Sequence, residues 1–339
     1  MIRYGPPTGL KEVTRKVCMT LQRDPLVIDD FRGMNFWLSN FRKKELTVDS
    51  ITYPSAEHAF HAQKTHDLAL RQKIADASTP MAAKRLGRNL ALRPDWEAVK
   101  REVMANVIAA KFDDVFLRLF LDQTNDALLI EGNSHHDNVW GSCVCPKHKS
   151  WAGKNWLGKT LMAERARRRG DENVFTRVAV TGHRPQFMTT DQTVWAYDEL
   201  ARLATKLRDN FGTTTAISGM AIGADAMWAE TSIQTGLDLW AYIPFEDQPA
   251  KFSPSELQDW ERHRATAVRE LCLGTEYDVR LFHSRNDFMI RDADLMICVY
   301  DPAKTTGGTA STIKKIKAQG TAHILMDIVG RKTRLIKAK

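Results

Sequence analysis

Three side chains that can take part in catalysis lie at helical spacing in the stretch YPSAEHAFHAQK, residues 53–64. Seven residues separate Glu57 from Lys64, so two helical turns would place both on one side, with the imidazole of His61 between them. Carboxylate, imidazole and amine groups are the ones that general acid–base and covalent catalysis use. Opposite charges on a helix are more often a solvated pair, so this stripe becomes evidence only together with other motifs.

Other motifs accompany this stretch, in the order WLSNF (37–41), GRNLALRPDWEAVKREVM (87–104), AAKF (109–112), EGNSHHDNVWG (131–141) and GKNWLGKTLM (153–162). Together the motifs resemble the NADAR family, over about residues 28–168. The family includes the N-glycosidase of riboflavin-biosynthesis intermediates, and some members remove ADP-ribose from guanine bases in nucleic acid. The resemblance therefore implies hydrolysis of an N-glycosidic bond between a base-like group and ribose.

The resemblance also implies roles for individual residues, carried over motif by motif. The implied catalytic residues are Glu57, Lys64, Asp137 and Trp140. The implied substrate-binding residues are Trp96, Asn155, Asn40 and His61. His61 stands where the family commonly has glutamine, so its role is the least secured by the resemblance.

The chemistry of the reaction suits these residue types. Cleavage of a glycosidic C–N bond develops positive charge on the ribose C1′ and ring oxygen, and a nearby carboxylate stabilises that charge or activates water. Glu57 or Asp137 could do this while the other binds hydroxyls or donates a proton. Lys64 offers a second route, because a desolvated amine can form a Schiff base with the opened sugar. Trp96 and Trp140 suit stacking on the leaving base, with core packing as the alternative.

The segment SCVCPKHKSWA departs from the family pattern. Cys143, Cys145 and His148, with His135 or His136 nearby, could bind zinc. The C-x-C spacing differs from the usual C-x₂₋₄-C, and the family's chemistry needs no metal. We therefore expect a lid loop with incidental thiols, and neither a metal nor another cofactor.

Three glycine-rich turns in the second half, TGHRP, SGMAIGAD and TTGGTAS, each follow a short apolar run. Glycine lets the backbone approach phosphate, and a following helix N-terminus presents free N–H groups. The alternative is turn geometry without a ligand. The contacts predicted for a nucleotide are Arg184, Ser218, Gly219, Gly223, Asp225, Asn286, Gly307, Gly308 and Thr309, with Asp301 as a weaker candidate.

With AYIPFEDQ, RNDFMIRDAD and VYDPAKTTGGTA, these turns resemble the SLOG superfamily and its YpsA-like group, over about residues 176–328. The resemblance implies a Rossmann-like fold that senses nucleotides or cleaves base–ribose bonds. The PGGxGTxxE signature of the superfamily's phosphoribohydrolases is missing here. We therefore expect this half to bind an NAD-derived or ADP-ribose-related nucleotide without turning it over.

Hydrophobic periodicity divides the chain into two fold types. The first half predicts a hairpin over 45–53 and helices over 55–66, 69–78, 81–86, 95–111, 115–121 and from 155 into 164–169. The second half predicts a helix over 191–209 and strands over 177–181, 214–218, 238–244, 279–283, 295–300 and 323–328. The helical periodicity of the first half predicts a mainly-α N-terminal domain. The alternation of strands and helices in the second half predicts an α/β C-terminal domain with a doubly wound parallel sheet. The predicted boundaries are an extension over 1–27, domains over 28–169 and 174–339, and a linker over 170–173.

Composition narrows the location and the partners. The 339 residues contain five scattered cysteines, Cys18, Cys143, Cys145, Cys272 and Cys298, which favours a reducing cytoplasm over a disulfide scaffold. We see no signal-peptide pattern and no apolar run long enough for a bilayer, and so expect no membrane partner. The net charge is +8, and the first 170 residues hold 28 Lys and Arg against 19 Asp and Glu. This excess favours a nucleotide, pyrophosphate or nucleic-acid partner, with solubility as the alternative.

The sequence thus predicts a two-domain cytoplasmic N-glycosyl hydrolase that acts on ADP-ribose-type conjugates, with ADP-ribosylated nucleic acid as a substrate. Free riboflavin-pathway intermediates are an alternative substrate. Two further alternatives are a protein that sequesters a nucleotide signal without turnover and a nucleic-acid-binding module. The domain combination suggests phage defence, and whether the chain forms a homo-oligomer stays open.

Overall fold

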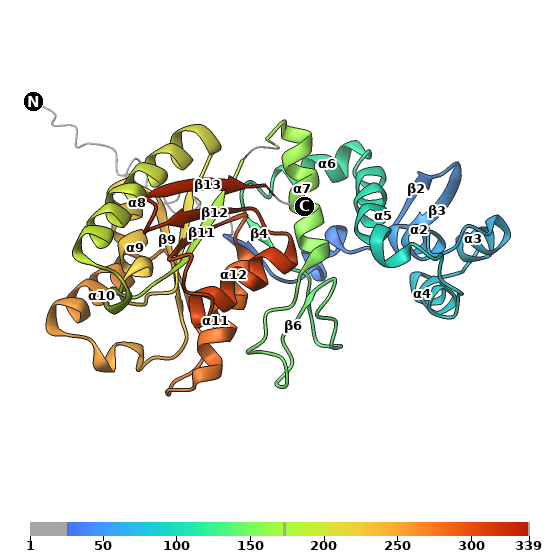
Figure 1. The fold of residues 1–339 in the computed structure, drawn as a ribbon. Coiled ribbons are helices and arrows are strands. Elements are labelled where there is room, and N and C mark those ends of the chain that lie inside the picture. The colour runs from blue at the N-terminus through green and yellow to red at the C-terminus, as the bar shows by residue number, and fades with distance from the viewer. Residues whose placement is uncertain (1–25, 172–173, 338–339) are drawn as a thin grey trace, which may run out of the picture. The chain divides into compact units, whose positions relative to one another are not determined.

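The computed structural model describes residues 26–171 and 174–337. Most of the expected N-terminal extension, with Cys18, lies outside the described residues, as do positions 172 and 173 of the expected linker. The chain divides into two compact units, Met1–Ile130 and Glu131–Lys339, and each is considered by itself (Figure 1). No helix within the described residues combines the length and the apolar character needed to cross a membrane.

Helices and one hairpin make up most of the first unit. Its elements are β1 (Val27–Ile28), η1 (Gly33–Leu38), β2 (Lys43–Val48), β3 (Ile51–Ser55), α2 (Ala56–Ala62), α3 (Leu68–Ala75), α4 (Pro80–Arg88), α5 (Trp96–Lys111), α6 (Val115–Asp122) and β4 (Leu128–Leu129). Strands β2 and β3 pair antiparallel, which confirms the predicted hairpin. Asp49 and Ser50 both have positive φ angles, as a two-residue hairpin turn requires.

Helix α2 is shorter than the predicted span of 55–66. It starts with the Ser55 hydroxyl accepting the N–H of His58, and it ends at Ala62. Beyond that point the carbonyl of Lys64 accepts the N–H of Arg93, at 2.8 Å. Tertiary hydrogen bonding therefore replaces the helical pattern, and Lys64 lies past the helix end.

The second unit opens with a pair of two-residue strands and a long helix. Strand β5 (Gly132–Asn133) pairs parallel with β6 (Ser142–Cys143). Helix α7 (Trp156–Arg169) follows and ends at Gly170, whose left-handed backbone closes the last turn.

A seven-stranded sheet forms the rest of this unit, in the order β10-β9-β8-β7-β11-β12-β13. Its strands are β7 (Arg177–Gly182), β8 (Thr215–Ser218), β9 (Asp238–Ile243), β10 (Arg269–Cys272), β11 (Leu295–Tyr300), β12 (His323–Asp327) and β13 (Lys332–Ile336). The sheet is mixed, which corrects the prediction of a purely parallel one. Strands β12 and β13 pair antiparallel because the segment between them is too short for a crossover helix.

Helices cover both faces of the sheet, so this unit is an α/β domain (Figure 1). They are α8 (Thr190–Phe211), α9 (Ala224–Gln234), α10 (Pro254–Thr266), α11 (Val279–Asp292) and α12 (Gly308–Gln319), with short turns η2 (Pro185–Phe187) and η3 (Gln248–Lys251). On one face Val178 and Val180 pack in a core with Trp228 of α9. On the other face the Arg177 guanidinium donates to the carbonyl of Asp292 at the end of α11.

The predicted strand over residues 279–283 is wrong. This run begins α11, because the Asp278 carboxylate accepts the N–H of Arg280 and the helix continues to Asp292. The strand that lies between β9 and β11 along the chain is instead β10. It forms an edge of the sheet, and its charged Arg269 and Glu270 suit that position.

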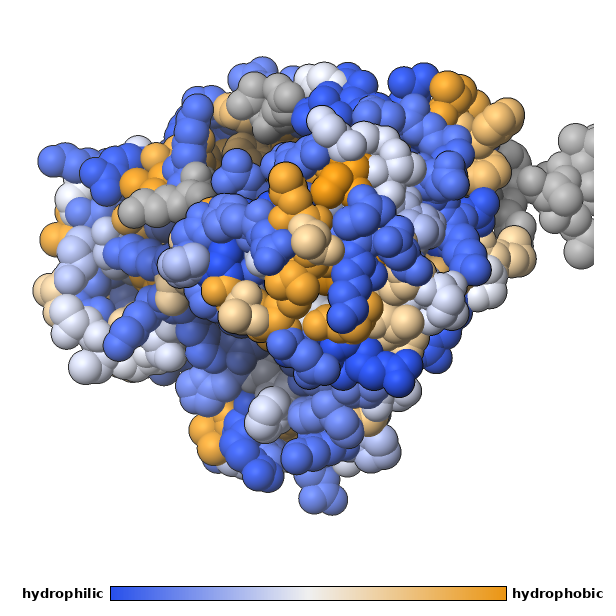
Figure 2. Space-filling model, turned by 90° about the vertical axis from the view of Figure 1, so that its right-hand side faces the viewer, coloured by the Kyte–Doolittle hydropathy of each residue, from blue (hydrophilic) through white to orange (hydrophobic). Residues whose placement is uncertain are grey.

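Hydrophilic side chains cover most of the surface seen in Figure 2, with a group of apolar residues near its centre. Exposed apolar side chains of the first unit are concentrated on α6, where Val115, Phe116, Leu119 and Phe120 are exposed.

Candidate functional site

Glu57 lies in the first turn of α2 with only 6% of its surface exposed. Its N–H donates to the carbonyl of Asn40 at 3.1 Å, which ties the start of α2 to the segment after η1. Its Oε1 contacts the Nε2 of His61 at 3.2 Å and the Nζ of Lys84 at 3.5 Å. A buried carboxylate is thus held beside one imidazole and one ammonium group.

The ammonium group beside Glu57 comes from Lys84 of α4, which the sequence analysis did not single out. Lys64 contacts other groups: its Nζ donates to the carbonyl of Gly87 at 3.4 Å and lies 5.8 Å from the Trp96 ring centre. Burial lowers the pKa of Lys64, while the negative charge of Glu57 opposes that shift. A lysine that is less readily protonated suits a nucleophile better than a permanent counter-ion.

His61 is a residue of α2, and its buried side chain faces α4. Burial lowers its pKa, and the hydrogen bond with Glu57 acts in the opposite direction. A side-chain carbon at Gly87 would lie 2.4 Å from the Nδ1 of His61, so only glycine allows α4 to approach this closely. The glycine of the GRNL motif therefore places both His61 and Lys84.

Trp96 and Asn40 are buried as well. The Trp96 ring lies 5.3 Å from the Phe60 ring, in a tilted arrangement. Asn40 donates from Nδ2 to the sulfur of Met104, and its buried Oδ1 has no hydrogen-bond partner among the described residues. That oxygen is an unsatisfied acceptor, which is unusual for a buried polar atom.

A second lysine that the sequence analysis did not assign supports the Asn40 segment. Lys111, in the AAKF motif, is almost fully buried, and its Nζ donates to the carbonyls of Leu38 and Ser39, at 2.9 Å each. Burial, with a smaller contribution from the charge of Arg42, lowers the pKa of Lys111 to about 7. The AAKF motif was the only sequence signal for it.

The other implied residues belong to the second unit and are described within it. The Oδ1 of Asp137 accepts the N–H groups of Val139 and Trp140, at 2.9 Å each, and so shapes the loop. The rings of Trp140 and Trp156 meet edge to face, 5.5 Å apart.

Asn155 is fully buried and has a left-handed backbone, with φ 52°. Its Oδ1 accepts the N–H of Glu131 at 2.9 Å, which joins the start of α7 to the segment before β5. Through these contacts Asn155 positions the backbone on either side of it.

A cavity of about 810 Å³ lies at the carboxyl ends of β7 and β11. The strand order reverses between these neighbours, and ligands of open α/β sheets bind at such a point. The predicted contacts that line the cavity are Arg184, Asp225, Asn286, Gly307, Gly308 and Thr309. Lys304, His183 and Arg285 also line it, and the sequence analysis did not assign them.

Ser218 and Gly219, also predicted contacts, do not line the cavity but bind residues that do. The Ser218 hydroxyl donates to the carbonyl of Asp225 at 2.8 Å, and the Asp225 carboxylate accepts the N–H of Gly219 at 2.9 Å. Arg285 donates to the Gly219 carbonyl and lies 3.5 Å from Asp225. A side-chain carbon at Gly219 would collide with the Arg285 guanidinium, which explains the glycine.

Gly307 and Gly308 form the start of α12 at the cavity. Gly307 has φ 94°, and no atom lies within 4 Å of the side-chain position at either glycine. The Thr309 hydroxyl donates to the carbonyl of Gly182, so the helix start is anchored to the end of β7. The N-terminus of α12 thus faces open space with its N–H groups, as anion binding requires.

Asn286 and Asp301, which were also predicted to contact a nucleotide, form hydrogen bonds within the protein. Asn286 donates to the hydroxyl of Thr312 at 2.9 Å. The N–H of Asp301 donates to the Nε2 of His183 at 2.9 Å. Burial, assisted by the charge of Lys304, lowers the pKa of His183, which fits an imidazole nitrogen that accepts a hydrogen bond.

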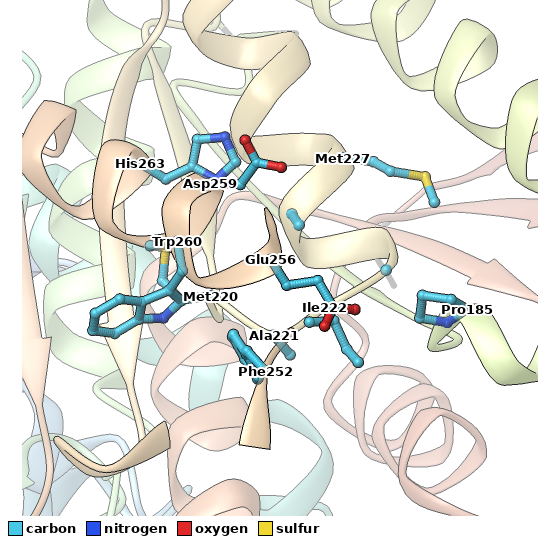
Figure 3. A pocket seen from close by; sticks show the side chains of 12 residues that line it. Pro185, Met220, Ala221, Ile222, Met227, Phe252, Glu256, Asp259, Trp260 and His263 are labelled. Atoms are coloured by element: carbon cyan, nitrogen blue, oxygen red, sulfur yellow. The ribbon is translucent and has the colours of Figure 1, made fainter. Parts of the chain in front are cut away.

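A smaller cavity of about 170 Å³ lies beside the turn that contains Gly223 (Figure 3). Met220, Phe252 and Trp260 give it an apolar wall, and α10 contributes Glu256. Gly223 approaches the carbonyl of His183 so closely that a side chain would not fit.

The segment for which we expected no metal brings four ligand side chains together. They are His136, Cys143, Cys145 and His148, whose ligand atoms all lie within 4.8 Å of one another. His135 is not one of them.

Comparison with known proteins identifies the first region. The model of the NADAR domain matches residues 30–169. N-glycosidase YbiA of Shigella flexneri serotype 5b is 42% identical over 127 residues, which cover 37% of this chain and 76% of that protein. N-glycosidase Npun_R5314 of Nostoc punctiforme is 38% identical, over 38% of this chain and 81% of that protein. Riboflavin biosynthesis protein VVA0006 of Vibrio vulnificus is 35% identical, over 38% of this chain and 34% of that protein.

These similarities define the class as the N-glycosyl hydrolases, so the chain is an enzyme of that class. The chain belongs to the NADAR family through residues 30–169. The matched region contains Glu57, Lys64, Asp137 and Trp140, and it ends before the seven-stranded sheet.

Proposed function

We propose that the chain hydrolyses the bond between the ribose C1′ and a base nitrogen in ADP-ribose-type conjugates, with ADP-ribosyl-guanine in nucleic acid as the substrate. The observation that carries the proposal is the buried Glu57 carboxylate, held by His61 and Lys84. Desolvation strengthens the interaction of a carboxylate with the positive charge that develops at C1′.

In the proposed reaction the C–N bond breaks as positive charge builds on the sugar. A water molecule then forms the new C–O bond and loses a proton to the Glu57–His61 pair, and a proton reaches the leaving base nitrogen. We propose that Asp137 holds ribose hydroxyls through the carboxylate oxygen that does not bind the loop N–H groups, and that Trp140 stacks on the base. Trp96 and Asn155 then act by positioning other groups, and the unpartnered Oδ1 of Asn40 accepts a substrate hydrogen bond.

A covalent variant of this mechanism uses Lys64. Its lowered pKa leaves more of the amine unprotonated, so the amine would attack C1′ as the C–N bond breaks and the protonated base leaves. The sugar ring would then open to an imine on Lys64, and water would hydrolyse this imine to release the sugar and the free amine. Borohydride reduction during turnover would trap the adduct on Lys64. Turnover without any trapped adduct would leave the direct attack of water as the route.

For the second unit we propose a Rossmann-like domain of the SLOG type that binds an NAD-derived or ADP-ribose-related nucleotide. The 810 Å³ cavity at the strand-order reversal supports this, together with the free N-terminus of α12 and the cations of Arg184 and Lys304. The matched NADAR region covers the first residues of this unit, up to residue 169, and ends before the seven-stranded sheet begins at Arg177. The role in phage defence stays a prediction.

The decisive experiment compares substrates with matched variants. Wild-type protein should release ADP-ribose from guanine-ADP-ribosylated DNA. Glu57→Gln should be slower by about 10³-fold, the scale of losing a buried electrostatic group. Glu97→Gln, which changes a 77% exposed carboxylate of α5, should keep full activity. Tight binding without release by the wild type would support a sequestering protein, and binding that falls steeply with salt would support a nucleic-acid module.

Free riboflavin-pathway intermediates are the second candidate substrate, favoured by the similarity to riboflavin biosynthesis protein VVA0006 of Vibrio vulnificus. The positive charge of the first 170 residues favours a polyanion instead. Release of the base from a phosphorylated riboflavin intermediate, without release of ADP-ribose from DNA, would favour this second candidate.

A further inference from the structure

We propose that His136, Cys143, Cys145 and His148 form a structural zinc site in the loop region around β6 (Figure 1). The site lies outside the proposed catalytic groups, and nothing in the proposed hydrolysis requires a metal. It replaces the expectation of a loop with incidental thiols.

The distances among three of the ligand atoms fit one tetrahedral ion, and the Cys143 sulfur lies within 4.8 Å of these three. The Nδ1 atoms of His136 and His148 are 3.2 Å apart. The sulfur of Cys145 lies 3.5 Å from the first of these nitrogens and 3.4 Å from the second. Around tetrahedral zinc, two nitrogens are about 3.3 Å apart, and a nitrogen and a sulfur about 3.6 Å apart.

The ligand set selects the metal. Two thiolates with two imidazoles are a ligand set that tetrahedral zinc favours, whereas magnesium and calcium favour oxygen ligands. All four positions come from the protein, so no position is left open for water or substrate. Such a closed site is structural, and it does not activate a nucleophile.

The backbone brings these side chains together in a defined way. Cys143 is held in β6, where its N–H donates to the Oδ1 of Asn138. Cys145 and His148 are joined by a turn in which the N–H of His148 donates to the Cys145 carbonyl at 2.9 Å. His136 has φ 68°, a costly conformation for a residue other than glycine. That conformation belongs to the histidine whose ring joins the cluster, and the neighbouring His135 does not contribute.

The cross-link has a consequence for the proposed active site. Asp137 follows His136 directly, and its carboxylate organises the turn to Trp140. A metal that joins His136 to Cys143, Cys145 and His148 fixes both ends of this loop. We therefore expect zinc to hold Asp137 and Trp140 in place without touching the substrate.

The first test measures metal in the full-length protein after purification without chelators. Elemental analysis should find a single zinc ion per chain. Replacement of zinc by cobalt should give the absorption bands of tetrahedral cobalt, together with thiolate-to-cobalt charge transfer. Absence of bound zinc, combined with a zinc affinity weaker than micromolar, would overturn the proposal. A mass that shows a disulfide between Cys143 and Cys145 in freshly purified protein would overturn it as well.

Single-residue variants should show which side chains bind the zinc ion. Cys145→Ser and His136→Ala should weaken zinc binding by more than the roughly 10–100-fold that loss of an outer-shell partner costs. The matched controls are His135→Ala and Cys272→Ser, which change a neighbouring histidine and a cysteine outside the cluster, and both should keep the zinc. Equal loss of zinc in variants and controls would contradict this ligand set. Cobalt spectra of the wild type decide the question even where a variant fails to fold.

Discussion

The two candidate sites both bury a carboxylate beside a cation, but they use it differently. In the first unit Glu57 contacts His61 and Lys84, and none of these contacts ties down backbone. In the second unit Asp225 accepts the N–H of Gly219 and pairs with Arg285, which itself binds the Gly219 carbonyl. The first arrangement leaves side chains ready for chemistry, whereas the second fixes a turn.

The surroundings of the two carboxylates also differ, in a way that supports the same distinction. Glu57 lies among helices, with titratable neighbours whose pKa values are lowered by burial. The cavity near Asp225 is large and is lined by glycines and a free helix N-terminus. Reaction chemistry needs desolvated groups that can exchange protons, and binding needs an open space with fixed donors. The contrast supports a catalytic first region and a binding second region.

The largest expected effect is on the stability of the second unit. Arg285→Met leaves the buried Asp225 without its cation, and breaking a buried pair costs about 3–5 kcal/mol. Urea denaturation followed by tryptophan fluorescence would measure the change. Arg280→Met removes an exposed arginine from an ion pair with Asp278 and should change stability by less than about 1 kcal/mol. Equal effects of both changes would contradict a structural role for Asp225.

A smaller loss, in catalysis alone, should follow from Lys84→Met. Removal of the ammonium beside Glu57 should lower kcat by about 100-fold, the scale of a positioned charged group. Steady-state kinetics on the conjugate would show it, with the exposed Lys73→Met as the control. If Lys64→Met reduced kcat far more than Lys84→Met, the covalent route through Lys64 would replace direct attack by water.

The lowered pKa of Lys111 should be visible in the pH dependence of the free energy of unfolding. Its folded pKa is about 7, below the ordinary 10.5, so the folded state binds fewer protons between those values. The free energy of unfolding should therefore rise with pH in this window, by at most about 1.4 kcal/mol per pH unit. In Lys111→Met this contribution should vanish, whereas Lys73→Met should keep it. Denaturant titrations at pH 7, 8 and 9 would test the difference.

The smallest effect is expected in the 810 Å³ cavity for which we propose a nucleotide ligand. Lys304→Ala should weaken binding of an ADP-ribose-type ligand about fivefold, or ~1 kcal/mol, because a partly exposed cation contributes modestly to phosphate binding. Calorimetry would measure it, with Lys314→Ala on the exposed side of α12 as the control. Hydrolysis at the first site should be unchanged in both variants. A parallel loss of hydrolysis would show that the two regions are coupled.

Most of the elements could be predicted because local patterns specify them. Hydrophobic periodicity gave the helices that became α5 and α8, and the two-residue turn at Asp49 and Ser50 gave the hairpin. The segment over 279–283 was misread because a short apolar run fits a strand or a helix equally well. Its Asp278 cap and the continuation to Asp292 decided for a helix.

The sequence by itself determined the family, the chemical types of the implied catalytic residues, and the glycine turns that follow the strands. Only the tertiary structure decided which partners meet. Lys84 reaches Glu57 because Gly87 lets α4 approach His61, and no spacing along the chain encodes that crossing. Likewise His136, which has a left-handed backbone, and not His135, lies with the cysteines, and the spacing along the chain did not distinguish the two. Local patterns specify elements, whereas contacts between distant residues depend on how those elements pack.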